Sequence, residues 1–138
     1  MSKPRSLGDL QLAILRELWR RGEASVAEVH RTLYRRRKLA LTTIATMLRK
    51  MEDRRLVKHR AEGRQFIYRA AVREDEVHRD LVADTVDRVF SGDASAMVSY
   101  LLSEEEFDGA DLAEMKALIQ AKEKAIRSRR RKRGGRAR

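Results

Sequence analysis

The chain has 138 residues, of which 42% are hydrophobic and 5% aromatic, which suits one ordinary domain with an aliphatic core or a small domain with an appended helical module. It has no cysteine, which excludes disulfides, thiolate metal sites and cysteine nucleophiles. No apolar run approaches the roughly 18 residues of a membrane span, and the N-terminus lacks a signal-peptide core, so we expect a soluble, cytoplasmic protein.

The net charge of +11 is distributed unevenly. Residues 1–70 carry a net charge of +11, residues 71–127 carry −7, and residues 128–138 carry +7. A basic front followed by an acidic middle is typical of a polyanion-binding domain joined to a segment with another role.

Two helices are predicted in the first part of the chain. Apolar residues at helical spacing predict a helix over Leu7–Arg21, which Gly22 ends. A second, short helix is predicted over Val26–Arg35, because Ser25 and Glu28 form a capping box. Two capping boxes compete for the start of the first helix, Ser6 with Asp9 and Gly8 with Gln11.

A third helix is predicted over Thr42–Arg54, after a short turn, which gives a helix-turn-helix order. Its inner stripe holds Ile44, Met47, Leu48 and Met51. Short hydroxyl side chains near the start and cations further along suit a helix that reads base edges and holds phosphates. The predicted DNA-contacting residues of its outer face are Thr42, Thr43, Thr46, Arg49 and Lys50. Thr42 also suits the N-cap, and the alternative is a solvated helix face with a threonine cap.

Basic residues flank this helix on both sides. Before it, Arg36, Arg37 and Lys38 follow Arg35 in a corner that suits phosphate contacts, although such runs are usually solvated turns. After it, two strands over 56–60 and 65–69 form a hairpin, with Gly63 at its turn. Lys58, Arg60 and Arg64 would face the DNA backbone, and Phe66 and Tyr68 would pack the hairpin. The hairpin completes a winged helix-turn-helix domain over residues 6–71.

The acidic part, residues 72–126, is predicted to be a helical dimerisation module. Three helices over 73–90, 94–102 and 110–124 each carry one apolar stripe. Such a stripe commonly packs against a second copy, so we expect a homodimer, with a helical cap on the chain's own winged domain as the alternative. Residues 127–138 are expected to be a disordered basic tail with non-specific phosphate contacts. The predicted dimerisation residues are Leu81, Val82, Val86, Val89, Phe90, Met97, Leu101, Leu112, Met115, Leu118 and Ile119.

The sequence does not indicate an enzyme, a cofactor or a metal site. His30, His59 and His78 lie in different elements, without ligand spacing. Asp80, Asp84 and Asp87 share a helical face, which is more readily interpreted as solvated than as a divalent-ion site. Phosphate-cradle, G-x-S-x-G and H-E-x-x-H motifs are absent. The fold class is mainly α with a small β-hairpin wing. The function classes that remain are a sequence-specific repressor and a non-specific architectural DNA-binding protein.

The residues also resemble a known family, the penicillinase repressors (BlaI/MecI type, including the copper-responsive CopY branch). The segments that carry the resemblance are LGDLQLAILRELW at 7–19, SVAEVHRTL at 25–33, LALTTIATMLRKMEDRRLV at 39–57, EGRQFIYRA at 62–70 and DRVFSGDASAMVSYLL at 87–102. The resemblance implies a winged-helix transcriptional repressor that binds a palindromic DNA operator as a homodimer. It also implies a membrane metalloprotease sensor as a partner that inactivates the repressor.

The chain departs from the family pattern at several positions. Arg54-Arg55 stands where the family usually has Lys-Gly, Gln11 replaces a glutamate, and Ala71 replaces a proline. The Asn-Phe bond that is cleaved in protease-controlled members aligns near Tyr100–Leu101, where this sequence differs. The absence of cysteine excludes the copper-sensing mechanism.

Overall fold

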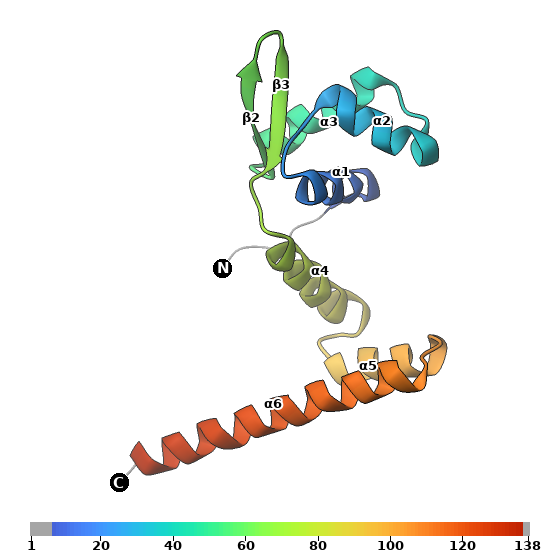
Figure 1. Ribbon diagram of the computed structural model, residues 1–138. Helices are drawn as coiled ribbons and strands as arrows, with labels where there is room; N and C mark the ends of the chain where they lie inside the picture. Colours follow the sequence, from blue (N-terminus) through green and yellow to red (C-terminus); the bar gives the residue numbers. More distant parts are fainter. Residues whose placement is uncertain (1–6, 137–138) are drawn as a thin grey trace. The chain divides into compact units, whose positions relative to one another are not determined.

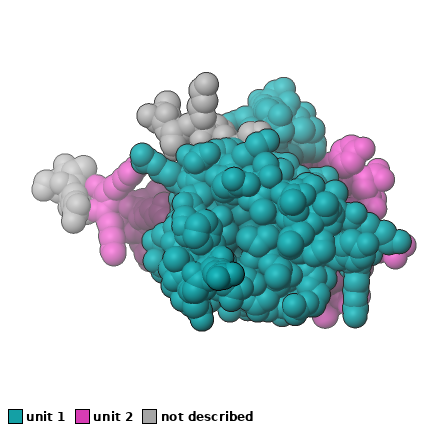
Figure 2. Space-filling model, turned by 90° about the horizontal axis from the view of Figure 1, so that it is seen from above, with its two compact units in different colours: residues 1–92 teal, residues 93–138 magenta. Residues whose placement is uncertain are grey.

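The computed structural model describes residues 7–136, so the predictions for Ser6 and for residues 137–138 lie outside the described part. The chain forms two compact units, which divide between Gly92 and Asp93 (Figure 2). The first contains α1 (Asp9–Arg21), β1 (Ala24–Ser25), α2 (Val26–Arg37), α3 (Leu41–Asp53), β2 (Val57–Glu62), β3 (Gln65–Ala70) and α4 (Glu74–Val89). The second contains α5 (Ala94–Glu104) and α6 (Gly109–Arg136).

The core of the first unit is aliphatic and is built from the predicted stripes of α1, α2 and α3, together with the base of the hairpin (Figure 1). Each fully buried aliphatic side chain contributes roughly 1.5–3 kcal/mol relative to exposure. The buried members of this cluster are Ile14, Leu15, Leu18, Ala24, Val29, Ile44, Leu48, Met51, Leu56, Val57 and Tyr68.

The first residues of α1, α2 and α3 show which of the predicted N-caps are formed. At α1, Gly8 is the N-cap and its backbone N–H donates to Gln11 Oε1 at 3.1 Å, which is the half of a capping box that a glycine N-cap can form. At α2, the Ser25–Glu28 box is confirmed in both directions, at 3.2 and 3.0 Å. The helix then continues to Arg37, beyond the predicted end, because arginine is a good helix former. At α3, Ala40 is the N-cap without a side-chain bond, so the prediction of Thr42 as a cap was wrong.

The end of α3 keeps a left-handed turn although no glycine is present. Arg55 has φ 63°, its N–H donates to Glu52 O at 2.9 Å, and the Leu56 N–H donates to Met51 O at 2.9 Å. This pair of bonds is the Schellman pattern, in which the left-handed residue is normally glycine. The Arg54-Arg55 departure therefore preserves the turn into the wing and places a strained residue in it.

The sheet has three antiparallel strands in the order β1-β3-β2. β2 and β3 form the predicted hairpin, with Val57 opposite Ala70 and Gly63 at φ 61° in its turn. β1 pairs Ala24 with Tyr68 and ties the start of α2 to the wing. Strand β1 was not predicted from the sequence, because two residues are too few to show an alternating pattern.

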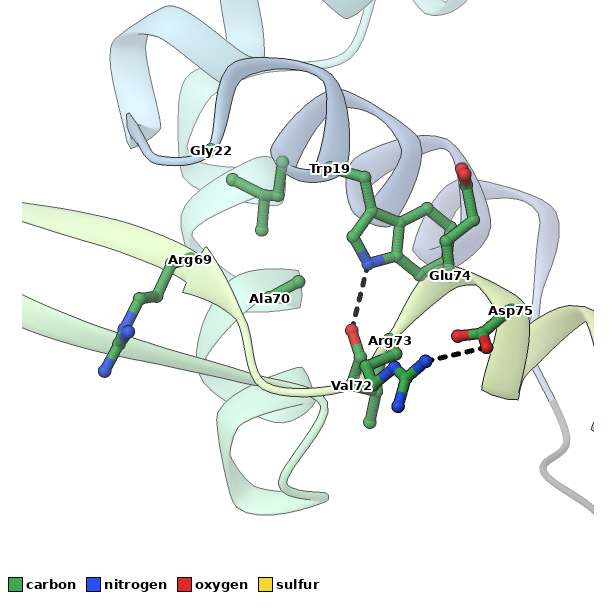
Figure 3. A pocket seen from close by; sticks show the side chains of 9 residues that line it. Trp19, Gly22, Arg69, Ala70, Val72, Arg73, Glu74 and Asp75 are labelled. Carbon is green, nitrogen blue, oxygen red and sulfur yellow. Dashed lines mark hydrogen bonds and ion pairs between the residues drawn. The ribbon is translucent and has the colours of Figure 1, made fainter.

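The helix α4 belongs with the winged domain, so the first unit extends beyond the boundary predicted at residue 71. Trp19 Nε1 donates to Val72 O at 3.0 Å (Figure 3). The Trp19 ring also meets the His78 ring edge-on, with centroids 6.3 Å apart. Val77 is fully buried. An indole N–H that leaves water requires an acceptor, and the turn before α4 supplies it. The physical reason for the shifted boundary is thus the aromatic end of α1, which α4 covers.

The second unit consists of two capped helices. Asp93 accepts from the Ala96 N–H at 3.0 Å at the start of α5, and Asp108 accepts from the Asp111 N–H at 2.8 Å at the start of α6. The helix α6 has 28 residues and runs to Arg136, so the expected disorder over residues 127–136 was wrong. Arginine and lysine favour helix, and cations near a helix C-terminus interact well with its dipole. No described residue of this unit is buried.

Candidate nucleic-acid interface

The helix α3 presents the predicted hydrophilic face to solvent. Thr42, Thr43, Thr46, Arg49 and Lys50 are exposed, whereas Ile44, Leu48 and Met51 are buried in the core. Four of these side chains line a shallow hollow together with Met47, and they are Thr42, Thr43, Thr46 and Lys50. Hydroxyls beside an apolar group suit base edges in the major groove, where thymine presents a methyl next to an acceptor. The chemistry of this face is that of a DNA-reading helix.

The basic corner lies at the end of α2, directly before this helix. Arg36, Arg37 and Lys38 are all exposed. A ring nitrogen of His30 lies 2.8 Å from Leu39 O, which holds the turn between α2 and α3. His30 therefore positions the recognition helix, a role that the sequence pattern did not show. The corner and the helix face together place exposed cations and hydroxyls between residues 36 and 50, interrupted by the apolar residues that α3 packs into the core.

The cations of the wing differ in whether they are engaged in ion pairs. Lys58 and Arg64 are exposed, and neither forms an ion pair with another residue in the range 7–136. Arg60 instead pairs with Glu23 at 2.8 Å and with Glu62 at 2.9 Å. The hydrogen bonds from Glu23 and then Glu62 raise the pKa of the Arg60 guanidinium. The predicted phosphate contact of Arg60 must therefore compete with two carboxylates, while Lys58 and Arg64 carry no such competition.

The aromatic residues of the wing, Phe66 and Tyr68, were both predicted to pack the hairpin, and they do so to different extents. Tyr68 is buried, and its desolvation raises the pKa of its hydroxyl. Phe66 remains 46% exposed and stacks on His59 with ring centroids 4.1 Å apart. His59 Nδ1 also contacts Glu52 Oε1, which joins the wing to the end of α3. His59 thus connects the hairpin to the end of α3.

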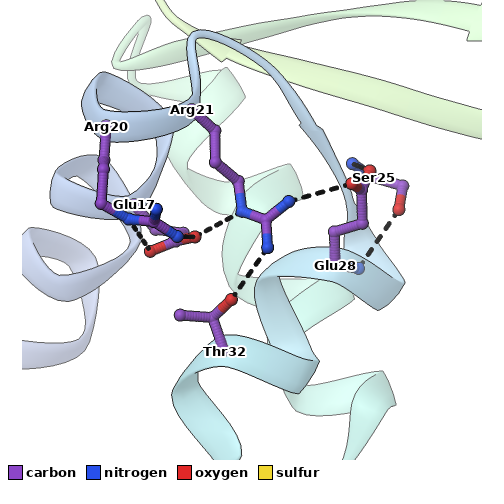
Figure 4. A network of polar contacts seen from close by, with 6 residues as sticks. All are labelled: Glu17, Arg20, Arg21, Ser25, Glu28 and Thr32. Carbon is purple, nitrogen blue, oxygen red and sulfur yellow. Dashed lines mark hydrogen bonds and ion pairs between the residues drawn. The ribbon is translucent and has the colours of Figure 1, made fainter.

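A network of hydrogen bonds and ion pairs joins α1 to α2 (Figure 4). Glu17 is only 6% exposed and accepts hydrogen bonds from Arg20 and Arg21. Arg21 continues to Glu28 at 3.0 Å and to Thr32 at 3.3 Å, so it joins α1 to α2. Burial would raise the pKa of the Glu17 carboxyl, but the hydrogen bonds from the two arginines together lower it. The Glu–Arg spacings of three and four along α1 were the signal that the sequence analysis overlooked.

The residues considered for catalysis are not brought together into a site. His30 and His59 hold turns and strands, as described, and His78 packs on Trp19. Asp84 pairs with Arg88 at 2.9 Å on α4. Within residues 7–136, no three His, Cys, Asp or Glu side chains are grouped so as to hold a metal ion. No helix in the same range is both long and apolar enough to cross a bilayer.

The residues predicted for dimerisation remain outside the described core. Among the large apolar ones, Val82, Val89, Leu101, Leu112, Leu118 and Ile119 are all exposed, at 41–66%. Leu81, Val86, Phe90, Met97 and Met115 are half-buried. Exposed apolar side chains of this number, present in each of the two units, are typical of binding surfaces.

Comparisons with known proteins agree with this geometry. Residues 7–121 match the family model described as "Penicillinase repressor". The "Transcriptional regulator BlaI" of two Mycobacterium tuberculosis strains is 33% identical over 124 residues, which is 85% of this chain and 90% of the relative. The "Penicillinase repressor" of Bacillus licheniformis is 22% identical over 87% of this chain and 94% of its own length. The solution structure of the DNA-binding domain of the repressor BlaI aligns with 55% of this chain and 93% of that domain, at 26% identity and a TM-score of 0.48.

The fold and the exposed face of α3 define a winged helix-turn-helix protein of the DNA-binding class. The family match covers most of the chain, and two relatives are 33% identical along nearly all of it. This chain belongs to the penicillinase repressor family.

Proposed function

We propose that this protein represses transcription as a homodimer that occupies a palindromic operator. As a penicillinase repressor it is a sequence-specific DNA-binding regulator, which is favoured over a non-specific architectural role. The observation that carries the proposal is the division of α3, whose apolar stripe is buried while its threonines, Arg49 and Lys50 are exposed. A regulator of this kind works where the chromosome lies, so the cytoplasm is the proposed location.

The mechanism needs no bond to be made or broken. Thr43, Thr46 and Arg49 would contact base edges in the major groove, and a good bidentate arginine–guanine pair contributes about 1–3 kcal/mol of discrimination. Exposed cations of the corner and the wing would neutralise phosphates, so affinity should fall steeply with salt. Bound in this way, the protein occludes the promoter.

The proposed dimer follows from the exposed apolar residues of α4, α5 and α6. A second copy supplies the complementary surface, because a two-fold interface joins the same patch on both chains. Two copies would then present their α3 helices to half-sites about 34 Å apart, one turn of the duplex. The symmetry of the protein would be mirrored in the operator.

The test is a footprint of the full-length protein on the DNA that flanks its own gene. We expect a protected palindrome, whose affinity exceeds that of random DNA of equal length by roughly a thousandfold or more. A ratio near one at physiological salt would instead establish the architectural alternative, and protection of a single half-site would contradict the dimer.

The release signal is a further part of the proposal. The family resemblance implies a membrane metalloprotease sensor, and the positions that align with the cleaved bond, Tyr100 and Leu101, are 62% and 42% exposed on α5. An immunoblot of cells before and after treatment with a penicillin tests this partner. A shortened chain supports cleavage, and an intact chain on a derepressed promoter argues for another route of release.

A further inference from the structure

The last ten residues of α6, from 127 to 136, form a second basic surface, which we call the basic arm. Seven of its residues are arginine or lysine and none is acidic. The preceding part of the helix, Gly109–Ile126, carries three acidic and three basic residues and is neutral overall. Ile126 is the last apolar residue before the arm. At this position the helix changes from a neutral segment with an apolar stripe to a segment whose charged residues are all basic. The cations of the arm are Arg127, Arg129, Arg130, Arg131, Lys132, Arg133 and Arg136.

The arm is helical, and its cations point in all directions. Successive residues in a helix are rotated by about 100°, so a run of five cations from Arg129 to Arg133 surrounds the axis. Every side chain from Arg127 to Arg133 is exposed, and no ion pair within the described part of the chain involves these cations. Like charges three and four residues apart repel each other. The arm therefore favours a ligand that supplies many negative charges at once.

The pattern also discriminates between possible polyanions. A helix that lies on an anionic membrane needs an apolar face beside its basic one, and the arm has none. An interface between copies of this helix would need an apolar stripe, which ends at Ile126. Double-stranded DNA offers one phosphate charge per roughly 1.7 Å and needs no apolar contact. An arm of ten residues spans ~15 Å of helix, enough to meet several phosphates.

We propose that the basic arm binds the phosphate backbone of duplex DNA as a second contact, separate from the α3 face and without base preference. The proposal rests on the proposed function in one respect, the identity of the ligand as DNA. The arm would add sequence-independent affinity and make binding more sensitive to salt. Its position in the second unit gives the protein two DNA-contacting surfaces on different parts of one chain.

The experiment compares two matched pairs of substitutions on α6 in the full-length protein. Arg130→Gln with Arg131→Gln removes two charges from the arm, and Lys116→Gln with Lys124→Gln removes two from the neutral part of the same helix. Glutamine keeps the helix propensity high in both pairs. The probe is a 40-base-pair duplex of random sequence, titrated at salt concentrations from 50 to 200 mM.

For the arm pair we expect the slope of log affinity against log salt to become shallower by about 2 per chain. Between 50 and 200 mM salt, the loss of affinity should therefore be roughly tenfold smaller for each arm that binds, and roughly a hundredfold smaller for a dimer that binds with both. The Lys116/Lys124 pair should keep the original slope. Equal slopes for all three proteins would overturn the proposal, and so would an equal decrease for both pairs, since the effect would then be one of net charge alone.

Two further measurements distinguish DNA binding by the arm from membrane binding and from a failure of the proposed repressor function. Binding to vesicles of phosphatidylcholine with phosphatidylglycerol, lost in the arm pair while DNA binding is unchanged, would identify a membrane surface and overturn the proposal. The preference of the unaltered protein for its operator over random DNA is measured in parallel. Loss of that preference would refute the proposed repressor without touching the slope, so the two failures are distinguishable.

Discussion

At the scale of single residues, Arg55 is the strained position in the turn from α3 into the wing. Its φ of 63° costs an L side chain roughly 1–2 kcal/mol, and glycine avoids this cost at the expense of a more flexible unfolded chain. We expect Arg55→Gly to raise the free energy of unfolding by about 0.5–1 kcal/mol, measured by urea denaturation. Arg54→Gly, at φ −86°, should lower it. A loss of stability in both variants would show that the Arg55 side chain compensates for its strain.

Glu17 is the residue whose charge supports the first two helices. Its folded-state pKa is lowered, so its contribution to stability is complete above the unfolded pKa of about 4.3 and is lost as pH falls through the lower folded value. Glu17→Gln should therefore destabilise the protein by about 1–2 kcal/mol at pH 7, and the difference should shrink below pH 4. Urea unfolding at pH 7 and pH 3.5 measures this. Asp87→Asn, on the exposed side of α4, is the control, and a pH-independent effect of Glu17→Gln would contradict the assignment.

At the scale of elements, we expect α3 to contact base edges and the end of α2 to contact phosphates. Arg49→Ala should cost about 1–3 kcal/mol on the operator and relax the preference at one base pair. Arg36→Ala, the matched arginine of the basic corner, should weaken binding to all sequences about equally and reduce the salt slope by about 1 per chain. Titration of the operator, its single-base variants and random DNA separates the two. If both variants lost the same affinity on every sequence, the base-reading role of Arg49 would be wrong.

The same elements show how far the sequence alone can reach. The stripes of α1 and α3 repeat over several turns, so their buried faces were predictable, and with them the exposure of Thr43, Thr46 and Arg49. Two features depended on contacts distant in sequence and were missed. Strand β1 exists only because Ala24 pairs with Tyr68, and Arg60 is engaged because Glu23 lies beside it.

A third difference was local, in the tail. Its composition was interpreted as disorder because like charges repel, but the helix that begins at Gly109 continues into it. Extending an existing helix avoids the cost of nucleation, which an isolated basic peptide would have to meet. The charge of residues 127–136 was therefore read correctly from the sequence, and their conformation was not.

At the scale of the whole molecule, the exposed stripe of α6 should decide the oligomeric state. Ile119 is 58% exposed and lies within this stripe, whereas Gln120 points away from it by one helical step. A carboxylate placed in an apolar interface loses its hydration without gaining a partner. We therefore expect Ile119→Glu to weaken the dimer by roughly 30-fold or more, while Gln120→Glu, which adds the same side chain beside it, leaves the dimer intact.

Sedimentation velocity at micromolar concentration measures this directly, and operator binding reports its consequence. A monomer can occupy only one half-site, so Ile119→Glu should lose most of the affinity for the full palindrome but little of the affinity for an isolated half-site. Gln120→Glu should behave as the unaltered protein on both. A single-chain mass for the unaltered protein, or equal association of the two variants, would mean that α6 does not join the two copies and that the spacing of the recognition helices has another origin.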